Sequence, residues 1–184
     1  MASILLVPIR PLQPASLSAL ALRLSERFQL PVVADGSHHL DPAPAFDSSR
    51  NQYYSSLLLS ALLRMFSRHE GKILAVTDAD LYIPVLTYVF GEAQLDGKAA
   101  IVSSRRLDER FYGLPGNADL FENRLLKEAV HELGHTFGLV HCRQYDCVMH
   151  SSTAVEEIDL KSSEFCTDCA RLLKRTNNET ATEI

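Results

Sequence analysis

The chain has 184 residues, of which 46% are apolar and 22% are charged, and its net charge is −5 at pH 7. This length is typical of one domain with a substantial core, and the composition is ordinary for a soluble globular protein. Proteins that bind nucleic acids usually carry a basic surface, so this acidic balance leads us to expect no nucleic-acid partner.

The first apolar segment is short. The run Ile4–Ile9 has no basic residue before it, and Arg10 and Pro11 follow it. Six residues are too few for the core of a signal peptide and far too few to cross a bilayer. We therefore expect a cytoplasmic protein with no membrane partner, and we expect a monomer. A leader or pro-segment outside this sequence is the alternative.

The next part of the chain alternates between the periodicities of strands and helices. In chain order we expect a strand, a helix, a strand, a helix and a strand, at residues 3–9, 14–28, 31–34, 51–69 and 72–77. A loop over residues 37–50 separates the second strand from the second helix, and its pair His38-His39 is expected to be solvated. This order predicts a mainly parallel sheet.

Two further apolar runs, at residues 84–90 and 98–103, have the character of strands. Only seven residues lie between them, and these include the turn signal Asp96-Gly97. A parallel crossover needs a dozen residues or more, so this pair should be antiparallel. The sheet is then mixed, and we expect residues 84–90 to form its antiparallel edge strand.

A polar segment at residues 105–116 should form a surface loop before the longest helix. Its arginines are mixed with acidic residues, which favours a solvated charge mixture over a substrate-binding cluster. Asp119 and Glu122 have the spacing of a capping box, and apolar residues at helical spacing follow them. We expect this helix to span residues 119–138.

Three histidines stand in and just beyond this helix. His131 and His135 are four residues apart, so both imidazoles lie on one face of the helix and can bind one Zn²⁺ ion. His141 would point away from that face if the helix continued. Gly138 can end the helix in the left-handed conformation, and the chain can then turn back and bring His141 to the same ion.

Three histidine ligands leave one coordination position for water, which is the arrangement of a catalytic zinc site. Glu132 follows the first histidine, beside the metal, and is free to act as a general base. The opposing interpretation is an amphipathic helix whose histidines line one side by chance. The specific spacing of five residues disfavours it, namely His131, Glu132, His135, Gly138 and His141.

All four cysteines lie near the C-terminus. Cys142 and Cys147 are separated by four residues, eighteen residues follow, and Cys166 and Cys169 are separated by two. This spacing is close to that of structural zinc sites, in which four thiolates close the coordination shell. Two disulfides are less compatible with a reducing compartment, and a redox role for Cys166 and Cys169 is weaker still because no strand precedes them.

The string His-Glu-x-x-His-x-x-Gly-x-x-His resembles the metzincin clan of zinc peptidases. The run that follows, with Cys142, Cys147, Met149 and the pair Cys166 and Cys169, resembles the archaemetzincin family. The resemblance covers residues 131–169. It implies that Met149 is the Met-turn methionine beneath the histidines, and that the antiparallel edge strand pairs with an extended substrate backbone. No tyrosine follows Met149 to stabilise an oxyanion, as one does in some metzincins.

The combined prediction is an α/β (α+β) fold, with a mixed, mainly parallel sheet covered by a backing helix and the metal-binding helix. We expect one domain, residues 1–184. Residues 1–138 would form a subdomain with the sheet and active-site helix. Residues 139–184 would form a zinc-clamped C-terminal subdomain, with a short helix at 170–175 and a frayed end from Asn177.

The predicted function is zinc-dependent peptide hydrolysis, with two Zn²⁺ ions per chain, one catalytic and one structural, and a peptide or protein as substrate. The alternatives are a non-catalytic zinc protein that binds peptides, a zinc-storage protein, and a hydrolase of a non-peptide amide. Retention of Glu132 disfavours the first of these, because binding alone does not need that carboxylate.

Overall fold

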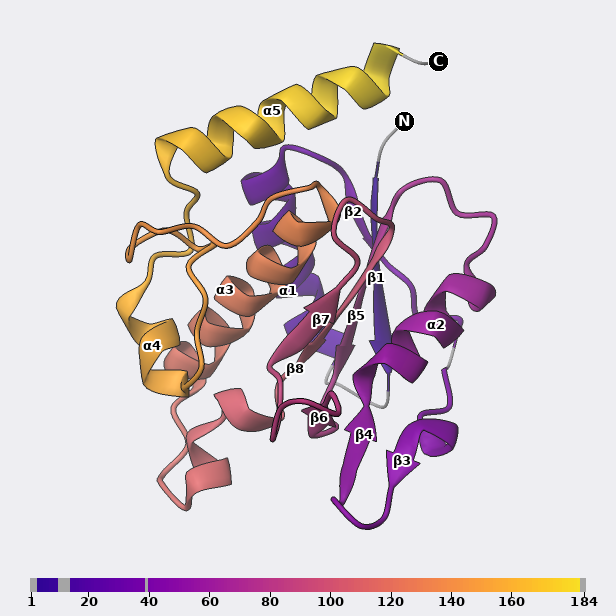
Figure 1. Cartoon of the computed structure of the whole chain (residues 1–184), viewed down its shortest axis with the longest axis vertical. Coiled ribbons are helices and arrows are strands. Elements are labelled where there is room, and N and C mark those ends of the chain that lie inside the picture. The colour runs from indigo at the N-terminus through magenta and orange to yellow at the C-terminus, as the bar shows by residue number, and fades with distance from the viewer. Residues whose placement is uncertain (1–2, 10–13, 39, 183–184) are drawn as a thin grey trace.

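A computed structural model describes residues 3–9, 14–38 and 40–182, and its centre is a five-stranded sheet (Figure 1). The strand order is β2-β1-β5-β8-β7. The strands are β1 (Ile4–Ile9), β2 (Val32–Ala34), β5 (Lys72–Thr77), β7 (Gly91–Ala93) and β8 (Ala99–Ser103). Strands β2, β1, β5 and β8 are parallel, and β7 is antiparallel to β8 at the edge. The predicted mixed, mainly parallel sheet is therefore confirmed.

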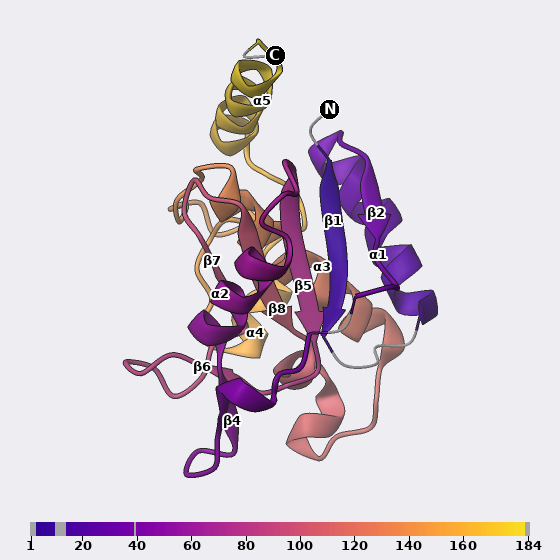
Figure 2. The same cartoon turned by 90° about the vertical axis from the view of Figure 1, so that its right-hand side faces the viewer.

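Helices cover both faces of this sheet. Helices α1 (Pro14–Phe28) and α3 (Ala118–Thr136) pack on one face, and α2 (Ser55–Met65) packs on the other (Figure 2). Side chains alternate along the buried strands, so that Leu74 and Val102 join the core with α1 and α3 while Ile73 and Ile101 join the core with α2. The histidine-bearing helix α3 is thereby fixed against a rigid sheet.

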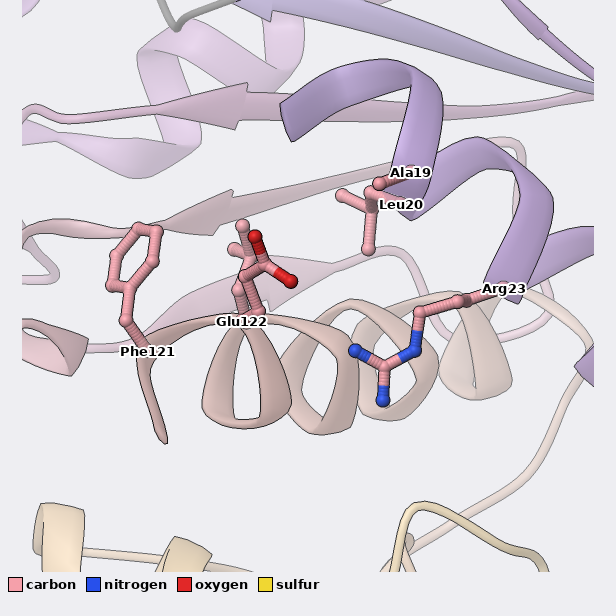
Figure 3. A pocket seen from close by; sticks show the side chains of 6 residues that line it. Ala19, Leu20, Arg23, Phe121 and Glu122 are labelled. Carbon is pink, nitrogen blue, oxygen red and sulfur yellow. The ribbon is translucent and has the colours of Figure 1, made fainter. Parts of the chain in front are cut away.

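The contact between α1 and α3 leaves a small hollow on the surface, lined by residues that include Leu20, Arg23 and Glu122 (Figure 3). Its volume of about 10 Å³ is no more than that of one water-sized probe. The hollow therefore reflects helix packing and offers no room for a ligand.

Within the described residues, no helix is long and apolar enough to cross a membrane.

The expected helix at 51–69 is shorter than predicted, because its first residues form a strand. Strand β4 (Gln52–Tyr54) lies between β3 (Phe46–Asp47) and β6 (Leu81–Tyr82) in a second, three-stranded sheet. Aromatic residues fit a pleated surface better than a helix start, and Tyr53 pairs with Leu81 there. The loop expected at 37–50 also contains β3 and a 3₁₀ helix, η1 (Ala43–Ala45). His39 lies outside the described residues.

The edge strand was predicted in the wrong place. Residues 84–90 form a turn and an irregular segment, and β7 begins only at Gly91, which pairs with Val102. The irregular segment is held from outside the sheet, since Arg50 donates hydrogen bonds to the carbonyls of Leu86 and Thr87 at 2.9 and 3.0 Å. Its apolar residues belong to a loop at the rim of a cleft. The prediction that the edge strand is antiparallel to its neighbour is confirmed, because β7 is antiparallel to β8.

Helix α3 begins one residue earlier than predicted and uses a different cap. The side chain of Asn117 accepts a hydrogen bond from the backbone N–H of Leu120 at 3.2 Å, so the Asp119–Glu122 capping box is not the N-terminal cap. The preceding loop contains two 3₁₀ helices, η2 (Arg105–Leu107) and η3 (Glu109–Tyr112). The helix ends at Thr136, two residues earlier than predicted, and the turn that follows includes Gly138, whose φ of +83° is the left-handed conformation that was expected.

The C-terminal segment contains two helices, α4 (Val155–Leu160) and α5 (Thr167–Thr182). Helix α5 is longer than the predicted 170–175 helix in both directions. It includes Cys169 near its start, and it continues past Asn177, where a frayed end was expected.

Candidate metal centre

Three imidazoles meet at one point at the end of α3. His131 and His135 are one helical turn apart, and their Nε2 atoms lie 3.1 Å from each other. The turn at Gly138 reverses the chain, and the ring of His141 lies 5.3 Å from that of His131 and 5.0 Å from that of His135 between centroids. One ring nitrogen from each histidine lies within 4.8 Å of the others. This donor set suits one Zn²⁺ ion.

Backbone carbonyls orient two of these rings. His131 Nδ1 donates to the carbonyl of Val148 at 2.8 Å, and His135 Nδ1 donates to that of Leu139 at 2.7 Å. Because Nδ1 carries the proton in each ring, Nε2 keeps a lone pair that can coordinate a metal. A hydrogen bond from the other ring nitrogen to a carbonyl is the usual arrangement of a metal-binding histidine. Burial lowers the pKa of all three histidines, so they stay neutral and able to coordinate.

Glu132 is buried beside the three histidines, with 7% of its surface exposed. Burial raises the pKa of this carboxyl well above its ordinary value, and the nearby charge of Glu128 raises it further. A β-carbon at Gly91, on the edge strand, would lie 2.5 Å from Cγ of Glu132. The edge strand therefore approaches Glu132 so closely that only glycine fits at this position.

A cleft opens over these groups. Two cavities, of about 390 and 300 Å³, share Gly91, His131, Glu132 and His141 in their walls. The larger cavity continues beside Leu95 at the end of β7. The smaller cavity continues between two loops, at residues 86–90 and 151–153. The three histidines therefore lie between two hollows that run along an edge strand.

Met149 is completely buried and packs against α3. A β-carbon at Gly134 would collide with its sulfur atom. The carbonyl of Met149 accepts a hydrogen bond from the N–H of Cys142 at 2.9 Å, which links this residue to the neighbour of His141. Met149 therefore contacts the helix at Gly134, in the turn between the two helical histidines.

A buried ion pair near the histidines was not found by sequence reasoning. Lys161 Nζ lies 2.9 Å from Oε1 of Glu128, and the two side chains are 1% and 4% exposed. Lys161 also donates to the carbonyl of His150 at 3.1 Å, so it ties α3 to the loop after Met149. The only available signal was the position of Glu128, four residues before Glu132 on the same face of the helix.

Two arginines of the segment 105–116, and His150, which follows Met149, are held by partners other than the three histidines. Arg110 pairs with Asp108, in keeping with the predicted charge mixture, whereas Arg106 is only 21% exposed and pairs with Asp80, outside that segment, at 2.6 Å. His150 donates from Nδ1 to the carbonyl of Cys142 at 2.9 Å and so holds the segment that follows His141.

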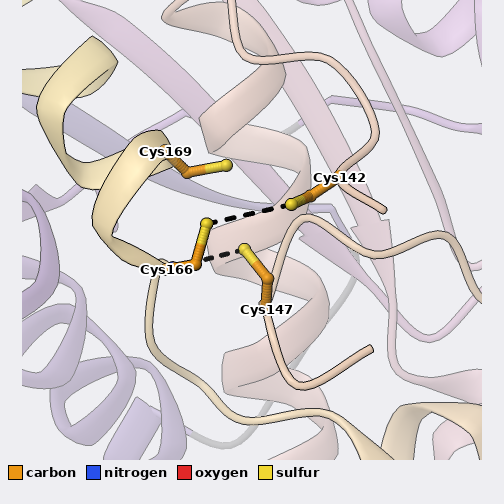
Figure 4. Close-up of side chains that lie close together, drawn as sticks. All are labelled: Cys142, Cys147, Cys166 and Cys169. Carbon is orange, nitrogen blue, oxygen red and sulfur yellow. Dashed lines mark hydrogen bonds between the residues drawn. The ribbon is translucent and has the colours of Figure 1, made fainter. Parts of the chain in front are cut away.

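The four cysteines form a second cluster, with all four Sγ atoms within 4.8 Å of one another. The four thiols point toward a common centre, two from the loop after α3 and two from the start of α5 (Figure 4). No disulfide joins them, and the sulfur atoms of Cys142 and Cys166 are 3.8 Å apart. Backbone N–H groups of Gln144 and Cys166 donate to two of the sulfurs. Such a set of soft donors can hold a tetrahedral zinc ion.

Comparisons with known proteins agree with this geometry. A family model described as "Peptidase family M54" matches residues 23–175. An archaemetzincin from Methanocaldococcus jannaschii is 44% identical over 133 residues, which are 72% of each chain. A crystal structure of an archaemetzincin from Methanopyrus kandleri has a TM-score of 0.83 at 34% identity and covers 96% of each chain. A zinc-dependent peptidase from Methanocorpusculum labreanum has a TM-score of 0.85 at 30% identity, and the match covers 93% of this chain and all of that one.

Proposed function

Because the chain belongs to peptidase family M54, the archaemetzincin family, and is a zinc-dependent peptidase, we propose that His131, His135 and His141 hold the catalytic Zn²⁺ ion. The observation that carries this proposal is the convergence of their three ring nitrogens within 4.8 Å beside a buried carboxylate. A zinc ion bound there would lower the pKa of a coordinated water to ~7 and would polarise the scissile carbonyl.

Glu132 is the general base. Its carboxylate takes a proton from the attacking water and passes it to the leaving amine. Two features of the site serve this task. Burial raises the pKa of Glu132 and makes the carboxylate a better proton acceptor, and the close approach of Gly91 confines its side chain.

The edge strand β7 positions the substrate. Gly91–Ala93 pairs with β8 on one side, and its other side borders the cavity that contains the histidines. An extended peptide laid along this edge can form main-chain hydrogen bonds with it. The scissile bond then lies over Glu132, because Gly91 lines both cavities together with that residue.

A second, structural Zn²⁺ ion is bound by Cys142, Cys147, Cys166 and Cys169, which gives two zinc ions per chain. Four thiolates fill a tetrahedral shell and leave no position for substrate. This ion clamps residues 139–184 into a C-terminal subdomain of the single domain 1–184. Small segments of this kind commonly need a metal to stay folded.

The remaining assignments follow from the same residues. Met149 is a Met-turn residue of the metzincin type, and its side chain is a hydrophobic support rather than a ligand. Reduced thiols favour a compartment such as the cytoplasm. The proposed catalytic groups all come from one chain, so a monomer is sufficient for activity.

Measuring zinc content together with cleavage of a peptide library tests the proposal. The Glu132→Gln variant should keep its zinc and lose activity by ~10²–10⁴-fold, the range that general-base catalysis contributes. Glu122→Gln, an exposed position on the same helix, is the matched control and should stay fully active. Full activity of Glu132→Gln would reject the mechanism. Peptide binding without cleavage by the wild type would favour a non-catalytic peptide-binding protein.

A further inference from the structure

The smaller cavity is bounded by two loops that come from opposite sides of the cleft. Residues 86–90, before the edge strand, form one wall, and residues 151–153, after Met149, form the other. A hydrogen bond joins the two walls, since the hydroxyl of Tyr88 donates to the carbonyl of Thr153 at 2.7 Å. The two residues are 65 positions apart in the chain, so this bond bridges the cavity through tertiary structure alone.

The Tyr88 side of this bridge is braced by several interactions. The guanidinium of Arg106 lies 4.0 Å from the centre of the Tyr88 ring, and Asp80 holds that guanidinium with hydrogen bonds of 2.6 and 2.8 Å. The carbonyl of Thr87 accepts hydrogen bonds from Gln52 and Arg50, both at 3.0 Å. The phenol is therefore held in place before any substrate arrives.

The Thr153 side is braced as well. The carboxylate of Glu157 accepts hydrogen bonds from the N–H of Thr153 at 2.5 Å, from its hydroxyl at 3.1 Å and from the N–H of Ala154 at 3.3 Å. These bonds fix the start of α4 and with it the Thr153 carbonyl. A bridge with both ends fixed is costly to displace, because opening it leaves a positioned donor and acceptor without partners.

The direction of the edge strand decides which part of a substrate meets the bridge. The bridged cavity lies at the Gly91 end of β7, and the other cavity lies at the Ala93 end, beside Leu95. Antiparallel pairing is the more stable arrangement per residue. A substrate antiparallel to β7 runs from the Ala93 end toward the Gly91 end, so the residues after the scissile bond enter the bridged cavity.

We propose that the Tyr88–Thr153 bridge makes this protein a peptidase that cuts close to the carboxyl end of its substrates. The inference rests on the proposed peptidase function of the histidine site. A chain that continues far beyond the scissile bond must break the bridge, whereas a short leaving segment fits within the cavity. Tyr88 is thus a specificity-determining residue.

Phosphinic pseudopeptides test the bridge without turnover, because the phosphinate mimics the tetrahedral transition state and fixes the register at the metal. Their affinities for the zinc-loaded protein are measured by calorimetry as the peptide is lengthened on the carboxyl or the amino side. In the wild type, lengthening on the carboxyl side beyond two residues should weaken binding by roughly threefold to tenfold, the equivalent of one lost hydrogen bond. Lengthening on the amino side should cause no such loss.

The Tyr88→Phe variant removes the hydroxyl and keeps the ring contacts with Arg106 and with Phe90, 5.4 Å away. This variant should bind pseudopeptides with long and with short segments on the carboxyl side with equal affinity. Ser25→Ala is the control, since it also loses one hydroxyl–carbonyl hydrogen bond, of 2.8 Å, and neither Ser25 nor its partner Leu30 lines the cavity. It should behave as the wild type.

Equal tolerance of long carboxyl extensions by the wild type and Tyr88→Phe would overturn the proposal. A penalty on amino extensions instead would overturn the assignment to the carboxyl side. Binding that follows the expected pattern, combined with an absence of cleavage of any peptide, would leave the bridge supported and reject the peptidase mechanism.

Discussion

Gly134 and Met149 pack so closely that position 134 has no room for a side chain. A β-carbon on Gly134 would collide with the sulfur of Met149 and would lie 3.1 Å from its terminal methyl group. Gly134 stands on α3 directly before His135, and Met149 follows Val148, whose carbonyl orients His131. The glycine therefore allows the loop after α3 to lie against the histidine-bearing turn of the helix.

Gly134→Ala should destabilise the protein although it places a better helix former in a helix interior. The gain in helix propensity is ~1 kcal/mol, whereas overpacking a filled core costs ~1–3 kcal/mol. We expect a net loss of free energy of unfolding by urea denaturation, and weaker zinc binding because the loop that carries Val148 is displaced. A double variant with Met149→Ala should show strong coupling between the two positions. A more stable Gly134→Ala protein would contradict this account of the packing.

Gly91→Ala should separate catalysis from metal binding. The added methyl group would lie 2.5 Å from Cγ of Glu132 and 2.6 Å from the carbonyl oxygen of Ile101, so the carboxylate must move. Misplacement of a catalytic group by ~1 Å can cost ~10²-fold in rate, and we expect kcat/KM to fall by that order. Zinc affinity should be unchanged, because no histidine is displaced. Gly36→Ala is the control, since its added methyl group would meet no atom within 4 Å.

The elements predicted correctly are those whose local pattern agrees with the fold. Leu17, Leu20, Leu24 and Phe28 repeat at helical spacing and all four are buried, so helix α1 has the bounds that were predicted. The histidine spacing with Gly138 predicted the convergence of three rings, because helix geometry and a left-handed turn are local properties.

The errors concern features that only tertiary structure determines. Residues 84–90 are as apolar as a strand, but residues 86–90 line a cleft, and Arg50, in the turn between β3 and β4, donates to their backbone carbonyls. Gly91 and Gly134 look like ordinary glycines in the sequence, and their importance comes from Glu132 and Met149, which lie far along the chain. The Glu128–Lys161 ion pair could not be inferred, because no local rule joins residues that are so distant in sequence.

The three buried histidines should make the metal-free protein less stable as the pH falls below neutral, and Glu132, whose pKa is raised by burial, should partly oppose this loss. Burial lowers the pKa of His131, His135 and His141 in the folded state below the ordinary value of ~6.5 that they regain on unfolding. The unfolded state therefore binds more protons between that value and the lower folded pKa values, and stability falls through this window. Urea unfolding of chelator-treated protein at pH 7.5, 6.5 and 5.5 measures the slope. His131→Gln should flatten it, and an equal slope in this variant would refute the linkage.

The two proposed metal sites should be thermodynamically coupled. The N–H of Val148 donates to the carbonyl of Glu164, two residues before Cys166, and the carbonyl of Val148 accepts from His131. Loss of the thiolate clamp should loosen this connection. The Cys166→Ser/Cys169→Ser variant should therefore hold one zinc ion fewer and should bind zinc at the histidines ~10–100-fold more weakly, the usual effect of losing an outer-shell partner.

Competition with a chelator of known affinity measures this coupling. Asp168→Ser, between the two cysteines on α5, is the matched control because its side chain is exposed and its only described ion pair is with Arg171. It should retain both zinc ions and wild-type affinity at the histidines. If the double cysteine variant also retained that affinity, Val148 would have to be held by its other contacts, and the two metals would be independent. A loss confined to the cysteine variant would mean that the structural ion stabilises the geometry of the catalytic one.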